Sequence, residues 1–103
     1  MVAQDHARTY RTNSVLTASP GQLVLMLYDG ALRSLRQARE GLARPESDTR
    51  RLESINTQLL KAQAIIAELQ GTLDHQAGGE FATTMHRLYD YYNRRLLEAN
   101  LRK

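Results

Sequence analysis

The sequence predicts an all-α protein: an antiparallel up-and-down bundle of three long helices. Apolar residues recur at alternating steps of three and four over three segments, and two short stretches with turn-forming residues separate these segments. No segment alternates apolar and polar residues as a half-buried strand would. With 103 residues the chain is predicted to be a single domain, and its short connections favour antiparallel neighbours.

The first helix is predicted over residues 19–42. Ser19 is a good N-terminal cap, because its hydroxyl can accept a hydrogen bond from an unpaired N–H of the first turn. Pro20 suits the first helical position, and Gln22 can bond back to the backbone of Ser19 to complete a capping box. These three residues therefore predict where the helix begins.

The first helix is apolar on every side between Leu23 and Tyr28, which predicts contacts on several sides. Gly30 lies in its middle, at a cost of about 1 kcal/mol relative to alanine, and this predicts a close approach by a neighbouring helix. The helix is expected to end near Gly41.

The second helix is predicted over residues 48–75, beginning at Ser47 or Asp48. Residues 75–79 are expected to end it, with the Gly78-Gly79 pair as a flexible turn. Its apolar seam consists of Leu52, Ile55, Leu59, Ala62, Ile66, Leu69 and Leu73. A second row, composed mainly of small residues that would let another helix approach closely, is Leu60, Ala64, Ala67 and Gly71.

The third helix is predicted over residues 80–103. One face of this helix is expected to consist of Phe81, Met85, Leu88, Tyr92, Leu96 and Ala99. The residues expected to extend that face sideways are Tyr89, Leu97 and Leu101.

The composition excludes several classes of protein. Without cysteine the chain has no disulfide, thiolate metal site or cysteine nucleophile, and this composition suits a reducing cytosol. The first ten residues lack the apolar core of a secretory signal, and no run approaches the roughly 20 apolar residues of a membrane span. We therefore expect no membrane insertion.

The positive charge, +3 at pH 7, raises the alternative of a nucleic-acid binder. The basic residues are spread along the chain, and Arg33, Arg36 and Arg39 step three apart along one stripe of the first helix. Such a stripe is typical of a solvated outer face. We expect no nucleic-acid partner; that alternative would require steeply salt-dependent binding to DNA or RNA.

Catalytic and metal sites are not predicted. A di-metal helical bundle needs Glu-x-x-His pairs, but the residues three before His6, His75 and His86 are not acidic. His86 and Asp90, one helical turn apart, are expected to form a surface ion pair rather than a metal site. No nucleophile elbow or phosphate-binding loop is present, so we expect no enzyme activity and no cofactor.

The segment before the first helix mixes apolar and polar residues. Tyr10, Val15 and Leu16 could pack against the domain's own core or form a detachable plug over a groove that a partner helix could occupy. Spacing alone leaves both alternatives open.

Three blocks of residues resemble one known family. Residues 10–30 follow the pattern Y-x-x-N-S-V-x-T-A-S-P-G-x-L-x-L-M-L-Y-D-G, which closely resembles the opening of the flagellar secretion chaperone family FliS. The similarity continues at Asn56 and 61–73 in the second helix and at 88–100 in the third. On these residues the whole chain, 1–103, is identified as one chaperone domain of that family.

The resemblance implies a protein of the bacterial cytoplasm that binds the C-terminal segment of flagellin and prevents its premature polymerisation. It also implies delivery of flagellin to the flagellar type III export apparatus. A segment that folds on binding can wrap a large surface with modest affinity, which suits later release. The alternative within the same class is a helix-binding adaptor that regulates flagellar assembly through another partner.

Family roles are expected at matching positions, with residues 1–18 lying over the groove. The residues expected to bind flagellin are Tyr10, Asn13, Val15, Leu16, Thr17, Leu23, Met26 and Leu27. Leu23, Met26, Leu27 and Tyr28 could equally be groove wall or core. Matching polar positions are Asp29, Tyr89, Asp90, Arg94, Arg95 and Asn100, and a structural role is favoured for Asp29 and Asn100.

One departure from the family pattern concerns the end of the bundle. Family members continue past the position of Asn100 into a further helix, so the family's final helix is expected to be missing here. Part of the face formed by Leu52, Leu59, Leu96 and Leu101 would then be uncovered. This deficit motivates the hypothesis that the chain forms a homodimer.

Overall fold

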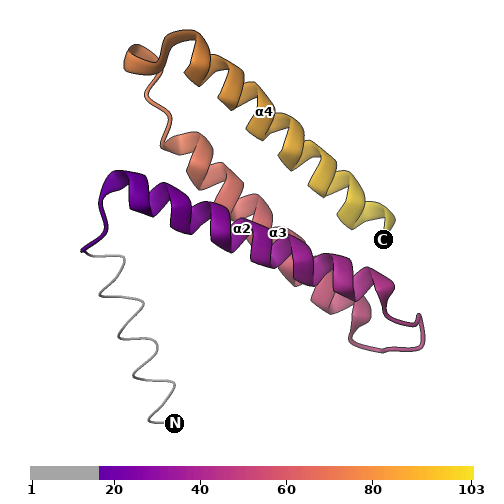
Figure 1. Cartoon of the computed structure of the whole chain (residues 1–103). Helices are drawn as coiled ribbons and strands as arrows, with labels where there is room; N and C mark the ends of the chain where they lie inside the picture. The colour runs from indigo at the N-terminus through magenta and orange to yellow at the C-terminus, as the bar shows by residue number, and fades with distance from the viewer. Residues whose placement is uncertain (1–16) are drawn as a thin grey trace.

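The computed structural model describes residues 17–103, and these residues form three helices. Helix α2 spans Pro20–Ala43, α3 spans Arg51–Gly71 and α4 spans His75–Arg102. The chain reverses between successive helices, so α2 and α4 run in the same direction while α3 runs against both (Figure 1). The predicted antiparallel all-α fold is confirmed, and the described part of the chain contains no strand.

The start of α2 agrees with its predicted cap. The backbone N–H of Gln22 donates to Ser19 Oγ at 3.2 Å, and the Ser19 N–H donates to Gln22 Oε1 at 2.8 Å. This reciprocal pair satisfies backbone donors that the first turn of a helix leaves free. The helix continues two residues past Gly41, to Ala43.

The boundaries of α3 differ from the prediction. The helix begins at Arg51 rather than near Asp48, because the Asp48 carboxylate accepts the Arg50 N–H at 3.0 Å in a turn before the helix. It ends at Gly71 rather than 75, and Asp74 then caps α4 by accepting the N–H groups of Gln76 and Ala77. An Asp that caps the next helix cannot continue the previous one.

The predicted end of the second helix over 75–79 is wrong. His75 already begins α4, and the backbone bends at Gly79, whose φ of +50° is a conformation that glycine adopts without strain. The sequence signal of the Gly78-Gly79 pair was correct about a break in the regular helix. It did not reveal that Asp74 forms a helical turn before this break.

The core lies along α3, which packs against both α2 and α4. The middle of the predicted seam is buried, whereas Leu52 is 53% exposed and Leu73 is half-buried. The buried seam residues are Ile55, Leu59, Ala62, Ile66 and Leu69. The second predicted row of α3 faces solvent: Leu60 is 51% exposed and Ala64, Ala67 and Gly71 are also exposed, so no described helix packs there.

The contact between α2 and α3 depends on small residues of α2. A Cβ atom at Gly30 would lie 3.3 Å from Ile65 Cδ1, which confirms the predicted close approach at this position. At Gly41 the approach is closer still, because a Cβ atom would lie 2.9 Å from Cγ1 of the fully buried Ile55. Ala31, Ser34 and Ala38 are buried on the same helix.

The contact between α3 and α4 instead carries a series of amide hydrogen bonds. Asn100 Nδ2 donates to Asn56 Oδ1 at 2.9 Å. Gln63 and Asn93 each donate from the side-chain amide to the other's backbone carbonyl at 3.3 Å. Gln70 Nε2 donates to the carbonyl of His86 at 3.1 Å and to Asp90 Oδ1 at 2.9 Å.

These amide contacts form a ladder with a constant spacing. Asn56, Gln63 and Gln70 follow each other at intervals of seven residues, and so do their partners at 86, 93 and 100. A seven-residue interval returns to nearly the same side of a helix. The ladder therefore sets one register between α3 and α4, and it confirms the structural role expected of Asn100.

Replacement of Gly41 by alanine is expected to destabilise the fold by about 1–2 kcal/mol. Overpacking against Ile55 outweighs the gain in helix propensity, which is at most about 1 kcal/mol. Gly21→Ala is the matched control, because nothing lies within 4 Å of the position that a Cβ atom would take there, and this variant should be neutral or stabilising. Urea denaturation measures both; a stabilising Gly41→Ala would contradict the close packing.

The amide ladder predicts energetic coupling between Asn56 and Asn100. Each single alanine variant should lose about 1 kcal/mol, because the remaining amide loses its partner. A double-mutant cycle measured by urea denaturation should give a coupling of about 0.5–1.5 kcal/mol. Additive losses would show that the contact does not contribute to the α3–α4 register.

Candidate partner-binding surface

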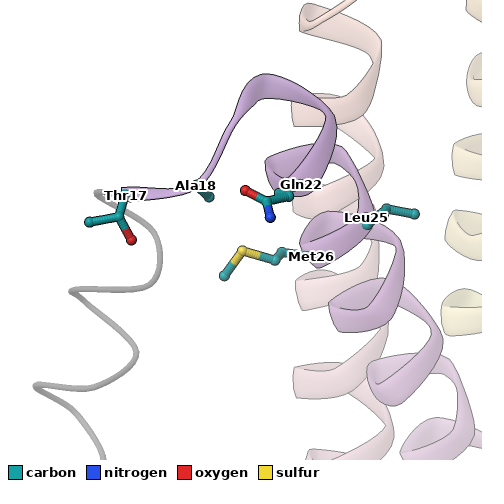
Figure 2. Close-up of a pocket in the computed structure, with 5 residues that line it drawn as sticks. All are labelled: Thr17, Ala18, Gln22, Leu25 and Met26. Carbon is teal, nitrogen blue, oxygen red and sulfur yellow. The ribbon is translucent and has the colours of Figure 1, made fainter.

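The first turns of α2 border a hollow of about 460 Å³, called here the N-terminal hollow. Its lining residues are Thr17, Ala18, Gln22, Leu25 and Met26. In Figure 2 the side chains of Thr17 and Met26 lie on one side of the helix, and Leu25 points away on the other. Leu25 is 65% exposed and Met26 is 38% exposed, so the hollow offers apolar surface to a partner.

The structure separates the eight sequence-predicted binding residues into three groups. Thr17 and Met26 line the N-terminal hollow. Leu23 and Leu27 are half-buried, and Leu27 packs against the buried cluster of α3 and α4, so it serves the core. The remaining four lie outside the described residues: Tyr10, Asn13, Val15 and Leu16.

The sequence analysis did not assign Ala18, Gln22 or Leu25 to the binding surface. A signal for Leu25 was present, because the run from Leu23 to Tyr28 is apolar all round. The expectation that this run is contacted on several sides is wrong for the described residues: Leu25, Met26 and Tyr28 are all exposed. A helix that packs against one neighbour must leave part of such a run uncovered.

The predicted apolar face of α4 is also largely uncovered. Phe81 is 69% exposed, Leu88 37% and Tyr92 43%, while Met85 and Leu96 are half-buried. The side of α4 that packs in the core is the side that carries Ala82 and Tyr89, which are 1% and 5% exposed. The periodicity correctly indicated an apolar stripe on α4. The buried residues, however, lie one position further along the sequence, at Ala82 and Tyr89 rather than at Phe81 and Leu88.

Helices α2 and α4 are joined by one hydrogen bond and pack against the same buried cluster. The hydroxyl groups of Tyr28 and Tyr89 form a hydrogen bond between the two helices, and Leu35 and Leu96 both pack against the buried cluster of Ala38, Ile55 and Leu59. Six of the large apolar side chains that remain exposed on these two helices are called here the α2–α4 apolar face. Its exposed members are Leu25, Tyr28, Leu32, Phe81, Leu88 and Tyr92.

The surroundings of Tyr89 change the pKa of its hydroxyl. Burial raises the pKa of Tyr89 to about 12, and the hydrogen bond with Tyr28 together with the nearby Tyr28 and Tyr92 hydroxyls acts in the same direction. The Tyr89 hydroxyl therefore stays protonated at neutral pH. Its hydrogen bond with Tyr28 joins α2 to α4 without placing a tyrosinate at the buried position.

The other polar positions are at the surface. His86 Nε2 lies 3.9 Å from Asp90 Oδ2 in an exposed pair one helical turn apart, as predicted. Arg33, Arg36 and Arg39 are exposed, which confirms the predicted solvated stripe. Asp29 is exposed as well, which does not support the structural role favoured for it.

The face of Leu52, Leu59, Leu96 and Leu101, which was predicted to be partly uncovered, is exposed at some of these residues and buried at others. Leu52 and Leu101 are 53% and 79% exposed, and Leu96 is half-buried. Leu59 is 4% exposed because it lies in the α3 seam between the two flanking helices. Residues 17–103 contain no cluster of three or more metal-ligating side chains, and none of their helices has the length and apolar character of a membrane span.

Comparison with known proteins settles the family. The family described as "Flagellar protein FliS" matches residues 3–103. The chain belongs to this family. The chain is 42% identical over 102 residues to the flagellar secretion chaperone FliS of Bacillus subtilis, covering 99% of the chain and 71% of that relative.

Two further relatives of this FliS-family chain carry the same kind of name. The flagellar secretion chaperone FliS of Salmonella typhimurium is 42% identical over 98 residues, covering 94% of the chain and 69% of the relative. FliSB of Pseudomonas aeruginosa is 37% identical over 86 residues, covering 84% of the chain and 64% of the relative. No solved structure matches the chain significantly. The relatives are named as chaperones, in agreement with the prediction that the chain is not an enzyme.

The tyrosine pair predicts a loss of stability at high pH. The pKa of Tyr89 is raised from 10.0 to about 12 in the fold, so its contribution is fully present below pH 10 and is lost as pH rises toward 12. Two pKa units correspond to no more than about 2.7 kcal/mol. Urea denaturation between pH 9 and 11 should show a shallower decline for Tyr89→Phe than for the wild type; equal slopes would contradict this assignment.

Proposed function

We propose that this chain is an export chaperone that binds the C-terminal segment of flagellin in the bacterial cytoplasm. It keeps that segment from polymerising prematurely and delivers it to the flagellar type III export apparatus. The observation that carries this proposal is the 42% identity, over 99% of the chain, to a relative named as a flagellar secretion chaperone. The absence of cysteine is compatible with a reducing compartment.

The surface chemistry supports a protein-binding role. Leu25, Met26 and Phe81 are large apolar side chains that remain at least 38% exposed. An apolar surface of this kind suits a partner segment that folds into helices only when it is bound, because burial of the segment's apolar face offsets the loss of chain entropy. Methionine is well suited to such a surface, since its flexible side chain adapts to different partners.

We assign the flagellin contact to the N-terminal hollow and its surroundings. Thr17 and Met26 line this hollow, and the chain preceding Thr17 carries Tyr10, Asn13, Val15 and Leu16. In this proposal residues 1–18 lie over the surface and influence access to it. In this proposal Leu23 and Leu27 contribute the half-buried side of the same turns of α2.

A homodimer is a secondary proposal. Leu52, Leu101 and the α2–α4 apolar face are apolar surfaces that no described residue covers. Association of two copies would remove part of that surface from water. Sedimentation of the free chain tests this directly; a monomer over the micromolar range would exclude a stable dimer.

The proposed function predicts that a labelled flagellin C-terminal peptide binds this chain with micromolar or tighter affinity. Met26→Lys should weaken binding at least about tenfold, because a lysine ammonium would have to be desolvated against an apolar helix face. Fluorescence anisotropy on titration of the peptide measures both affinities.

Leu101→Lys is the matched control. It makes the same change in charge at a site that is 79% exposed near the end of α4, away from the hollow. This variant should bind like the wild type. If the wild type shows no binding at micromolar concentration, the flagellin role fails and a helix-binding adaptor for another flagellar partner becomes the better explanation.

A further inference from the structure

The two histidines of α4 lie against each other. The imidazole rings of His75 and His86 have centroids 5.5 Å apart, with an angle of 67° between their planes. Along a straight α-helix, residues separated in sequence as these two are would lie about 16 Å apart. The rings are in contact because α4 is not straight between them. The spacing of the histidines in the sequence therefore does not reveal the pair.

Gly79 produces this departure from a straight helix. Its φ of +50° and ψ of −124° interrupt the helical dihedral angles, and the short first turn of α4 is set off from the rest (Figure 1). Such angles belong to turns in which glycine is favoured, because any other side chain is strained there. Asp74 fixes the turn before the bend by accepting the N–H groups of Gln76 and Ala77, both at 3.0 Å. The bend thus turns His75 back along the helix.

The fold does not use the ring nitrogens of His86. Nδ1 is buried and has no hydrogen-bond partner among residues 17–103. Nε2 lies 3.9 Å from Asp90 Oδ2, which is too far for a hydrogen bond. The side chain of His86 is 45% exposed. Because Nδ1 is buried, Nε2 is the nitrogen that a bound group can reach.

One amide of α3 holds His86 and its neighbouring carboxylate in place. Gln70 Nε2 donates to the carbonyl oxygen of His86 at 3.1 Å and to Asp90 Oδ1 at 2.9 Å. Both groups are therefore fixed relative to α3. His75 is exposed, so its ring is the one that can adjust to a bound group.

The charge around the histidine pair favours a cation. Residues 74–90 carry three carboxylates, Asp74, Glu80 and Asp90, and one guanidinium, Arg87. With neutral imidazoles their net charge is −2, whereas the whole chain carries +3. Glu80 and Arg87 line, together with His75, a hollow of about 530 Å³ on this end of α4. A cation at the imidazoles would thus lie in the acidic part of a basic chain.

The separation of the two rings matches a shared transition-metal ion. Zn–N bonds of about 2.0–2.1 Å with a tetrahedral angle between them place two imidazole centroids roughly 5 Å apart. The observed 5.5 Å is within a small side-chain adjustment of that value. Imidazole nitrogen is a ligand of Zn²⁺, Ni²⁺ and Cu²⁺, whereas Mg²⁺ and Ca²⁺ prefer oxygen ligands.

We propose that His75 and His86 bind one transition-metal dication such as Zn²⁺, in a site that the bend at Gly79 creates. The ion bridges the two sides of the bend and holds the first turn of α4 against the rest of the helix. Water completes the coordination, since residues 17–103 contain no cluster of three metal-ligating side chains. Two protein ligands make a weaker site than the three or four of the usual zinc centres, so the affinity is micromolar. The site is independent of the flagellin contact assigned above.

Calorimetric titration of Zn²⁺ into the full chain, without a histidine tag, tests the ligands. One ion per chain should bind with micromolar affinity, Ni²⁺ should bind as well, and Mg²⁺ should not bind at about 1 mM. His75→Gln and His86→Gln should each weaken Zn²⁺ binding at least about tenfold.

His6→Gln is the matched control for these variants. It removes the third histidine of the chain, which lies outside the described residues, and it should bind Zn²⁺ like the wild type. Absence of Zn²⁺ binding below about 1 mM, or equal binding of Mg²⁺, would overturn the proposal. So would a loss of binding in His6→Gln with full affinity in His86→Gln.

A pair of glycine variants tests whether the bend creates the site. Gly79→Ala keeps both imidazoles but strains the bend, and it should weaken Zn²⁺ binding at least about tenfold. Gly71→Ala is the control: nothing lies within 4 Å of either Cβ position, but only Gly79 has a positive φ. Circular dichroism checks that both variants fold. Wild-type affinity in Gly79→Ala would contradict the proposal.

Amide chemical shifts locate the ion and separate this proposal from the proposed function. Zn²⁺ should shift the signals of residues 74–90 and leave those of α2 unchanged; shifts centred on α2 would show that the site is wrong. His86→Gln should bind the flagellin peptide like the wild type. Failure of that peptide to bind the wild type would overturn the proposed function alone, because the Zn²⁺ titration does not involve it.

Discussion

The apolar seam of α3 is the interaction on which the rest of the fold depends. Ile55 is completely buried and Leu69 is 1% exposed, although within residues 17–103 only α2 and α4 flank α3. Burial of such side chains contributes roughly 1.5–3 kcal/mol each, so most of the apolar stabilisation is concentrated on this one helix. Because α2 and α4 both turn toward α3, each leaves apolar residues on its far side, and the candidate binding surfaces arise from that geometry.

The two flanking helices meet α3 by different means. Small residues on α2 let the backbones approach closely, as at Gly30 and Gly41, and the contact between these helices is apolar. On α4 the side-chain hydrogen bonds to α3 come from amides, as between Asn56 and Asn100, and Ala82 and Tyr89 are buried on the same helix. Apolar packing tolerates small shifts along a helix, whereas an amide pair has a defined partner. The polar contact thus contributes more to register, and the apolar contact more to stability.

The sequence predicted correctly those features of the fold that depend on residues close together in the chain. The cap at Ser19 depends on residues three apart, and the α3 seam depends on the helical period alone. The start of α3 was predicted wrongly because Asp48 can cap a helix or bond within a turn, and nearby residues decide between these. The same ambiguity applied to Asp74, which begins α4 instead of ending α3.

The candidate site was less predictable because exposure is a property of the assembled helices. The stripe containing Phe81, Leu88 and Tyr92 has the same periodicity as a core face. That this stripe is exposed follows only from the assembled helices, in which Tyr89 is the buried residue and bonds to Tyr28. Likewise, Met26 and Leu27 are adjacent apolar residues, yet one lines the hollow and the other packs in the core. The resemblance to a family suggested which residues bind but did not distinguish these two roles.

The amide ladder also constrains how the sequence can change in length. Its three rungs share one register, so insertion or deletion of a single residue within 56–70 or 86–100 would rotate the following rungs by about 100° and shift them along the helix. Substitutions at one rung leave the other two in place, whereas an altered length displaces every rung beyond it. Divergence in these segments is therefore expected to proceed by replacement of side chains, with length changes confined to the turns that connect the helices.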